Sequence, residues 1–134
     1  MESNQDTRTA PVRVLLVDDE VGYVNVLYNR LTKRHFKVGK ANSGADAFQL
    51  LRQQDFDVAV LDLKMEDMDG IEILKILKKM APELAVIMLT GHGSAEAAHE
   101  GIKQGAYDYL TKPCELEDLI AKIREAHEQR SAGE

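Results

Sequence analysis

Residues 58–70 read VAVLDLKMEDMDG, an apolar run that changes abruptly to acidic residues. The first four residues are all apolar, as in a strand covered on both faces, and Asp62 stands at the end of the run. Burying a carboxylate costs free energy unless the charge is paired or bound to a cation. Three further carboxylates, those of Glu66, Asp67 and Asp69, follow closely. Asp62 therefore needs a partner that the rest of the chain must supply.

This stretch belongs to a regular alternation of strands and helices. Apolar runs at 12–17, 36–41, 84–89 and 106–110 predict four more strands. The segments between and after the strands predict five helices, and in four of them apolar residues share one helix face. These residues are Val21, Val24, Leu27, Tyr28 and Leu31; Ala47, Phe48 and Leu51; Ile71, Leu74 and Leu77; and Leu116, Leu119, Ile120 and Ile123. The remaining helix, expected from Ser94 to residue 102, is rich in alanine, so we expect it to be the least firmly docked.

Strands that alternate with helices predict a parallel sheet with helices on both faces and right-handed crossovers. We therefore expect an α/β fold of the flavodoxin-like, doubly wound class with five parallel strands and five helices, and we adopt the strand order 2-1-3-4-5 of that class as a hypothesis. One domain over residues 12–128 accounts for the pattern. Residues 1–11 are predicted to be a disordered lead-in, and residues 129–134 a polar tail.

The composition is that of a globular domain, with 44% hydrophobic and 30% charged residues. The 23 acidic residues outnumber the 17 basic ones, and the resulting net charge of −6 argues against direct contact with nucleic acid. A single cysteine, Cys114, cannot form an internal disulfide. No run of residues approaches the length of a membrane span, and no signal peptide is evident, so we expect a cytoplasmic protein.

Polar residues follow four of the predicted strands: the acidic run 18–20, Asp62, Thr90 and Lys112. In open α/β sheets, ligands bind beyond the carboxyl ends of the strands. With the order 2-1-3-4-5, the first and third strands are neighbours about 4.8 Å apart, so Asp18, Asp19 and Asp62 crowd into one crevice. Crowded carboxylates need positive charge, which a divalent cation with oxygen ligands supplies, and Mg²⁺ is the natural candidate.

Each of these features has an ordinary structural explanation when it is taken alone. An acidic pair before a helix is often a helix-terminal charge, and an Asp after a strand is often a turn residue. The agreement of four independent placements on one edge of one sheet favours a functional site.

Four motifs carry a resemblance to the receiver domains of two-component response regulators, which spans about residues 12–128. They are LLVDDE (15–20), VLDLKMEDMDG (60–70), IMLTGHG (87–93) and AYDYLTKP (106–113). By this resemblance, Asp62 accepts a phosphoryl group from a histidine kinase or phosphotransfer protein. Asp18 and Asp19 bind Mg²⁺, and Asp62 and the backbone carbonyl of Lys64 complete the protein ligands.

The resemblance also implies how the phosphoryl group is held and sensed. Thr90 and Lys112 bind its oxygens, Tyr109 is the aromatic switch residue, and the peptide between Lys112 and Pro113 is cis. The fourth helix, fifth strand and fifth helix form the expected face for an output domain or a downstream protein, and a homodimer is a further possibility. The chain departs from the family at position 66, where Glu66 replaces the usual proline, so we expect a more mobile loop and an extra carboxylate near the metal.

Three other functions fit the sequence less well than a phosphorylation switch. A phosphatase of the haloacid dehalogenase type needs Asp-x-Asp after the first strand, whereas here Asp18 and Asp19 are adjacent. A flavodoxin-like redox carrier needs a phosphate-binding loop where this chain has acidic residues. A receiver that serves only as an interaction module, without phosphorylation, would not need these site residues, and all of them are present in this chain. The output is left open: the chain is either free-standing or part of a longer regulator, and its motifs resemble receivers of sigma-54-dependent activators.

Overall fold

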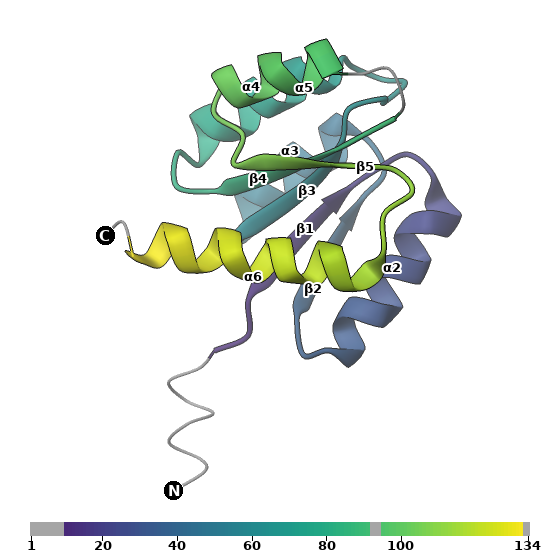
Figure 1. The fold of residues 1–134 in the computed structure, drawn as a ribbon, viewed down its shortest axis with the longest axis vertical. Coiled ribbons are helices and arrows are strands. Elements are labelled where there is room, and N and C mark those ends of the chain that lie inside the picture. The colour runs from purple at the N-terminus through teal and green to yellow at the C-terminus, as the bar shows by residue number, and fades with distance from the viewer. Residues whose placement is uncertain (1–9, 92–94, 133–134) are drawn as a thin grey trace, which may run out of the picture.

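The computed structural model describes residues 10–91 and 95–132, in which five parallel strands form one sheet in the order β2-β1-β3-β4-β5 (Figure 1). This order confirms the predicted topology. The strands are β1 (Arg13–Val17), β2 (Lys37–Ala41), β3 (Val58–Asp62), β4 (Ala85–Thr90) and β5 (Asp108–Thr111).

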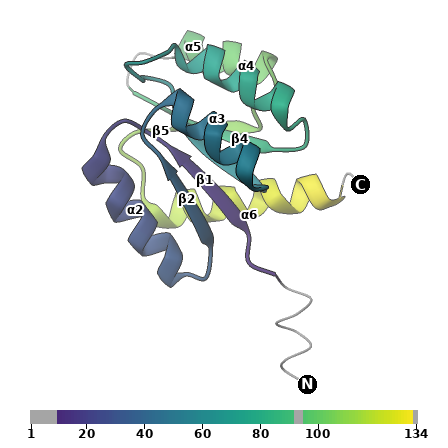
Figure 2. The same cartoon turned by 180° about the vertical axis from the view of Figure 1, so that it is seen from behind.

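Five helices are present in the described residues, also as predicted. They are α2 (Val21–Lys33), α3 (Gly44–Gln53), α4 (Gly70–Met80), α5 (Ala95–Lys103) and α6 (Leu116–Ala132). Helices α2 and α6 cover one face of the sheet, and α3, α4 and α5 cover the other (Figures 1 and 2). None of these helices combines the length and the apolar character needed to cross a membrane.

The sheet buries a separate apolar layer on each face, which explains why its central strands are apolar at nearly every position. In β1, Val14 and Leu16 pack into the layer under α2 and α6, whereas Leu15 and Val17 pack into the layer under α3 and α4. Strands β3 and β4 are buried along their whole length. Burial on both sides fixes the depth and register of the strands, and so fixes where each strand ends.

Most predicted strand boundaries lie within one residue of the observed ones, and the last strand differs most. It is predicted at 106–110 but runs from Asp108 to Thr111. The Ala106 amide donates to the Gly101 carbonyl of α5 at 3.0 Å, so the chain is still closing the helix at that point. Apolar composition alone does not reveal such a helix-terminal bond.

The predicted helix ends and faces are partly confirmed. The Ser43 side chain caps α3 by accepting the Asp46 amide at 3.0 Å. Val21 is 54% exposed at the start of α2, and Ile73 rather than Ile71 is fully buried in α4. Helix α6 continues into the predicted tail, to Ala132. Ser94 and residues 1–9 and 133–134 lie outside the described residues.

Gly70 is the first residue of α4. A Cβ atom on Gly70 would lie 2.5 Å from the Leu63 carbonyl oxygen and 2.6 Å from the Leu63 Cα. Because both atoms belong to the backbone, they cannot rotate away. Glycine therefore allows the loop after β3 to fold back tightly against the end of that strand.

This packing predicts opposite effects for two glycine-to-alanine substitutions. Gly70→Ala should lower the free energy of unfolding by about 2 kcal/mol, because the backbone must move to admit the methyl group. Gly22→Ala, in the first turn of α2, should leave it unchanged or raise it by roughly 0.5 kcal/mol, because a Cβ there would meet nothing within 4 Å. Urea unfolding followed by circular dichroism measures both. Equal effects of the two substitutions would contradict the close approach of Gly70 to Leu63.

Candidate functional site

The strand register brings the two central aspartates side by side. Val17 of β1 pairs with Leu61 of β3, and Asp18 and Asp62 are the next residues on their strands. Both are buried, with exposed fractions of 4% and 6%. Since the strands are parallel, both side chains lie at the carboxyl edge of the sheet, where they are predicted.

Each of these carboxylates uses one oxygen in a tight local turn. Oδ1 of Asp18 accepts the Glu20 amide at 2.9 Å, and Oδ1 of Asp62 accepts the Lys64 amide at 3.0 Å. These bonds satisfy one backbone amide in each of the loops that follow β1 and β3. They also orient the carboxylates and leave Oδ2 of each available to other partners.

Lys112, which directly follows β5, forms ion pairs with these carboxylates. Its Nζ lies 3.2 Å from Oδ2 of Asp18, 3.5 Å from Oδ2 of Asp62 and 2.9 Å from Oε1 of Glu20. The ammonium group also lies 4.5 Å from the centre of the Tyr23 ring, within range of a cation–π interaction. One lysine thus pairs with three carboxylates, and the site keeps an excess of negative charge.

The electrostatics of the site follow from this crowding. Burial raises the pKa of Asp18, and the neighbouring charge of Asp62 adds to that effect, whereas the Glu20 amide and Lys112 oppose it. Burial alone lowers the pKa of Lys112, but the hydrogen bond to Glu20 and the charges of Asp18 and Asp62 outweigh it, so the pKa is raised well above the ordinary value. Lys112 is therefore a permanent cation at this edge.

The donor set fits a hard divalent cation. Asp18, Glu20 and Asp62 each offer a carboxylate oxygen, and these oxygens lie within 4.8 Å of one another. A group made only of oxygen donors is what Mg²⁺ or Ca²⁺ prefers. The site is thus able to hold a metal ion, although exposed Glu20 takes the place in the group that the sequence analysis gives to Asp19.

Asp19 points to a different partner. Its Oδ2 accepts the backbone amide of Glu66 at 3.0 Å, in the loop between β3 and α4. The sequence analysis gives no role to Glu20, the third residue of the acidic run. Of the side chains of Asp18, Asp19 and Glu20, the first and third converge at the site. This choice depends on the turn in which Asp18 accepts the Glu20 amide, and a sequence pattern does not show that turn.

The second acidic cluster is split between two helices. Asp67 precedes α4 in the chain, but its Oδ2 accepts the Gly44 amide at 2.9 Å, at the start of α3. Asp69 occupies the position before α4, without a side-chain cap bond. The helix dipole favours a carboxylate near the start of either helix, so Asp67 stabilises α3 and Asp69 stabilises α4.

Thr90 and Tyr109 lie on the neighbouring strands β4 and β5, and β4 pairs with the strand that ends in Asp62. Thr90 is only 3% exposed, and its hydroxyl donates a long hydrogen bond of 3.5 Å to the Leu110 carbonyl. Tyr109 is 37% exposed and pairs in register with Met88 of β4. The Lys112–Pro113 peptide is cis, which confirms what the resemblance implies.

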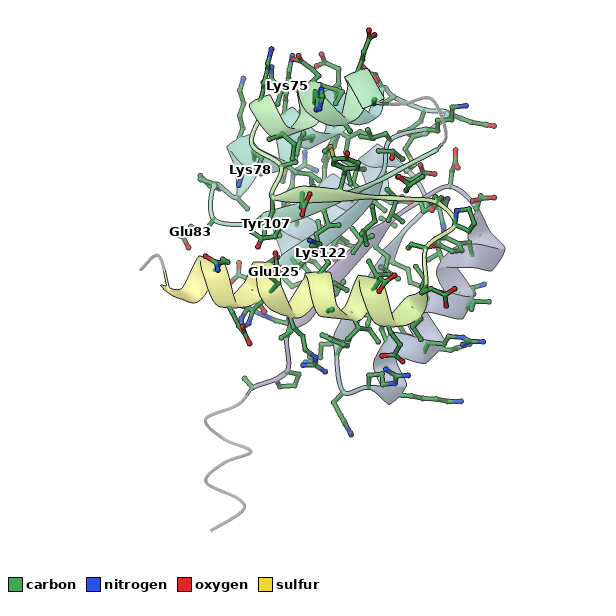
Figure 3. All side chains as sticks on the ribbon, in the orientation of Figure 1. Lys75, Lys78, Glu83, Tyr107, Lys122 and Glu125 are labelled. Atoms are coloured by element: carbon green, nitrogen blue, oxygen red, sulfur yellow. The ribbon has the colours of Figure 1, made fainter. Side chains whose placement is uncertain are left out.

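A network outside the site ties β5 to α6. The Tyr107 hydroxyl donates to Glu125, and Lys122 pairs with Asp108 at 2.8 Å and with Glu125 at 3.7 Å. Figure 3 shows Tyr107, Lys122 and Glu125 meeting between the edge strand and the helix. The hydrogen bond to Glu125 raises the pKa of Tyr107 to about 12. These contacts hold the strand that carries Tyr109 against the last helix.

Comparison with known proteins agrees with this geometry. The family model described as Response regulator receiver domain matches residues 14–124. The transcriptional regulatory protein GlrR of Escherichia coli (strain K12) is 38% identical over 119 residues, which are 89% of this chain and 27% of the relative. This chain therefore spans about a quarter of the length of that curated relative.

Solved structures show the same likeness. A response regulator receiver domain protein from Clostridium thermocellum superposes with a TM-score of 0.86 at 31% identity, over 92% of this chain and 99% of that chain. The receiver domain of NtrX from Brucella abortus superposes with a TM-score of 0.82 at 32% identity, over 86% of this chain and 98% of that chain.

Proposed function

The chain belongs to the response regulator receiver domains, the phosphoacceptor signalling modules of two-component systems, and we propose that its phosphoacceptor is Asp62. The observation that carries this proposal is the position of its carboxylate. Asp62 is buried at the end of β3, and its Oδ2 lies 3.5 Å from Lys112 and beside the carboxylate of Asp18. Asp62 thus sits at the centre of the site, with a permanent cation facing it.

The chemistry proposed for Asp62 is nucleophilic attack on phosphorus. A carboxylate oxygen forms a bond to the phosphorus atom while the bond to the donor, a histidine nitrogen of a kinase or phosphotransfer protein, breaks and that nitrogen keeps the electron pair. Such transfers need positioning and neutralisation of the phosphoryl oxygens more than covalent assistance. Lys112 supplies positive charge, and the Thr90 hydroxyl supplies a hydrogen-bond donor on the adjacent strand.

The metal that we propose is Mg²⁺. Asp18 and Asp62 would hold it, together with Glu20, whose carboxylate oxygen lies in the same group, or with Asp19 and the Lys64 carbonyl as the resemblance implies. When bound, it supplies further positive charge against the phosphoryl oxygens. The residues of the chain orient the carboxylates: the Glu20 and Lys64 amides fix one oxygen of Asp18 and of Asp62.

The proposed signal leaves through Thr90 and Tyr109. An aspartyl phosphate offers strong acceptor oxygens to the Thr90 hydroxyl, which now has only a long bond to the Leu110 carbonyl. Inward movement of Thr90 would leave room for Tyr109, whose side chain is partly exposed. The surface made by α5, β5 and α6 then becomes the face for an output domain, a downstream protein or a second copy.

The class of output that we propose rests on the relatives. The chain is homologous to receivers of regulators such as GlrR and NtrX, which supports an output of the sigma-54-dependent activator type. The kinase or phosphotransfer protein that serves as donor is proposed only by class.

Phosphorylation should add one phosphoryl group, on Asp62, and should require a divalent cation. Incubation with acetyl phosphate and Mg²⁺, followed by intact-mass measurement, should show the gain for wild type but not for Asp62→Asn or for wild type in EDTA. Asp69→Asn, which removes an exposed carboxylate from the same loop, is the matched control and should be labelled like wild type. Equal labelling of Asp62→Asn and wild type would rule out Asp62 as the phosphoacceptor.

Thr90→Ala should separate phosphorylation from its distant effects. Lys112 and the carboxylates remain in this variant, so Asp62 should still be phosphorylated, but amide shifts across β5 and α6 should shrink in NMR spectra because the hydroxyl that senses the phosphoryl group is absent. Thr111→Ala removes an exposed hydroxyl from the neighbouring strand and should respond like wild type. Undiminished shifts in Thr90→Ala would show that Thr90 does not couple the site to this face.

A further inference from the structure

The loop between β3 and α4 is attached directly to the acidic run after β1. The Glu66 amide donates to Oδ2 of Asp19 at 3.0 Å, and this is a hydrogen bond to a charged acceptor. The contact uses only the backbone of residue 66. Any residue except proline is able to make it, because proline has no amide hydrogen.

The Asp19 carboxylate that accepts this bond lies outside the group of carboxylates around Lys112. The oxygens that converge beside Lys112 come from Asp18, Glu20 and Asp62, and Asp19 does not belong to that group. Asp19 directly follows Asp18, so its backbone is close enough to serve the same site. The Glu66 amide therefore engages a carboxylate that would otherwise be free to turn toward a cation.

The rest of the loop has its own anchors. The carboxylate of Asp67 accepts the Gly44 amide at 2.9 Å, and Gly70 packs against the backbone of Leu63. Loss of the Glu66–Asp19 bond therefore leaves the loop attached at both sides of residue 66. The cost of releasing Asp19 is local, close to that of one charged hydrogen bond.

We propose that the Glu66 amide is a latch that holds Asp19 outside the carboxylate cluster and thereby weakens binding of a divalent cation at the site. This inference rests on the metal site proposed above. Because Asp19 lies outside the group of converging oxygens, its carboxylate would have to move to become a ligand, and that movement would strain or break its bond to the Glu66 amide. Cation binding by Asp19 and the attachment of the β3–α4 loop therefore oppose each other. Removing the amide hydrogen should then strengthen cation binding.

Three variants at position 66 separate the amide from the side chain. Glu66→Gln removes the charge, Glu66→Ala removes the carboxylate, and both keep the amide hydrogen. Glu66→Pro removes the carboxylate and the amide hydrogen together, so its comparison with Glu66→Ala isolates the latch. Mg²⁺ affinity is measured by isothermal titration calorimetry without any phosphodonor, and melting curves in EDTA check that each variant is folded.

Glu66→Pro should bind Mg²⁺ about tenfold more tightly than Glu66→Ala, the factor expected when one charged hydrogen bond no longer competes. Glu66→Gln and Glu66→Ala should bind slightly more weakly than wild type, since a nearby negative charge is lost. Affinity of Glu66→Pro equal to or below that of Glu66→Ala would overturn the latch while leaving the metal site intact. Absence of saturable Mg²⁺ binding in all four proteins would overturn the metal site itself and the latch with it.

A second measurement uses wild type alone and does not depend on how the proline variant folds. The Glu66 amide should be protected from hydrogen exchange in EDTA and should lose protection at saturating Mg²⁺, as followed in NMR spectra. The Gly44 amide, which is bonded to Asp67 in the same loop, is the internal reference and should keep its protection. Protection of the Glu66 amide that does not change with Mg²⁺ would contradict the latch.

Discussion

The repulsion between two buried carboxylates is the constraint on which the rest of the site depends. Asp18 and Asp62 lie side by side because β1 and β3 are hydrogen-bonded neighbours, and the sheet cannot separate them. Buried like charges are tolerated only with compensation, and Lys112 supplies it from the loop after β5. The ion pairs of Lys112 with Asp18 and Asp62 thereby link the carboxyl ends of β1, β3 and β5, which are far apart in sequence.

One lysine does not neutralise all the carboxylates of the site, and the remaining negative charge matters for what the site can bind. Glu20 adds a third carboxylate to the group around Lys112, so negative charge remains in excess. The excess favours a divalent cation. In the proposed function, that cation and Lys112 would together allow a phosphoryl group to approach the carboxylate of Asp62. A fully neutralised pair would be a stable structural feature without this capacity. The apolar layers on both faces of the sheet hold the strand ends in place while the charge changes.

The strand order 2-1-3-4-5 does not follow from apolar periodicity; it belongs to the flavodoxin-like class, and the structure confirms it. The sequence predicts the strands themselves and the placement of Asp18, Asp62, Thr90 and Lys112, because parallel strands end at one edge of a sheet. It does not predict the partners of Asp19 and Asp67. Asp19 bonds to the Glu66 amide, and Asp67 to the first amide of α3 rather than of α4. Both bonds join loops distant in sequence, and their choice depends on backbone dihedral angles in tight turns. The late start of β5 has the same origin, in a helix-terminal hydrogen bond.

The most direct test of the account is to locate a divalent cation in crystals. Mn²⁺, which takes the same oxygen ligands as Mg²⁺ and scatters anomalously, is soaked into crystals grown in EDTA. The account predicts one dominant anomalous peak at the carboxyl edge of the sheet, in contact with the carboxylates of both Asp18 and Asp62. A dominant peak elsewhere, or none at that edge at saturating Mn²⁺, would contradict the claim that this carboxylate cluster is built to take a cation.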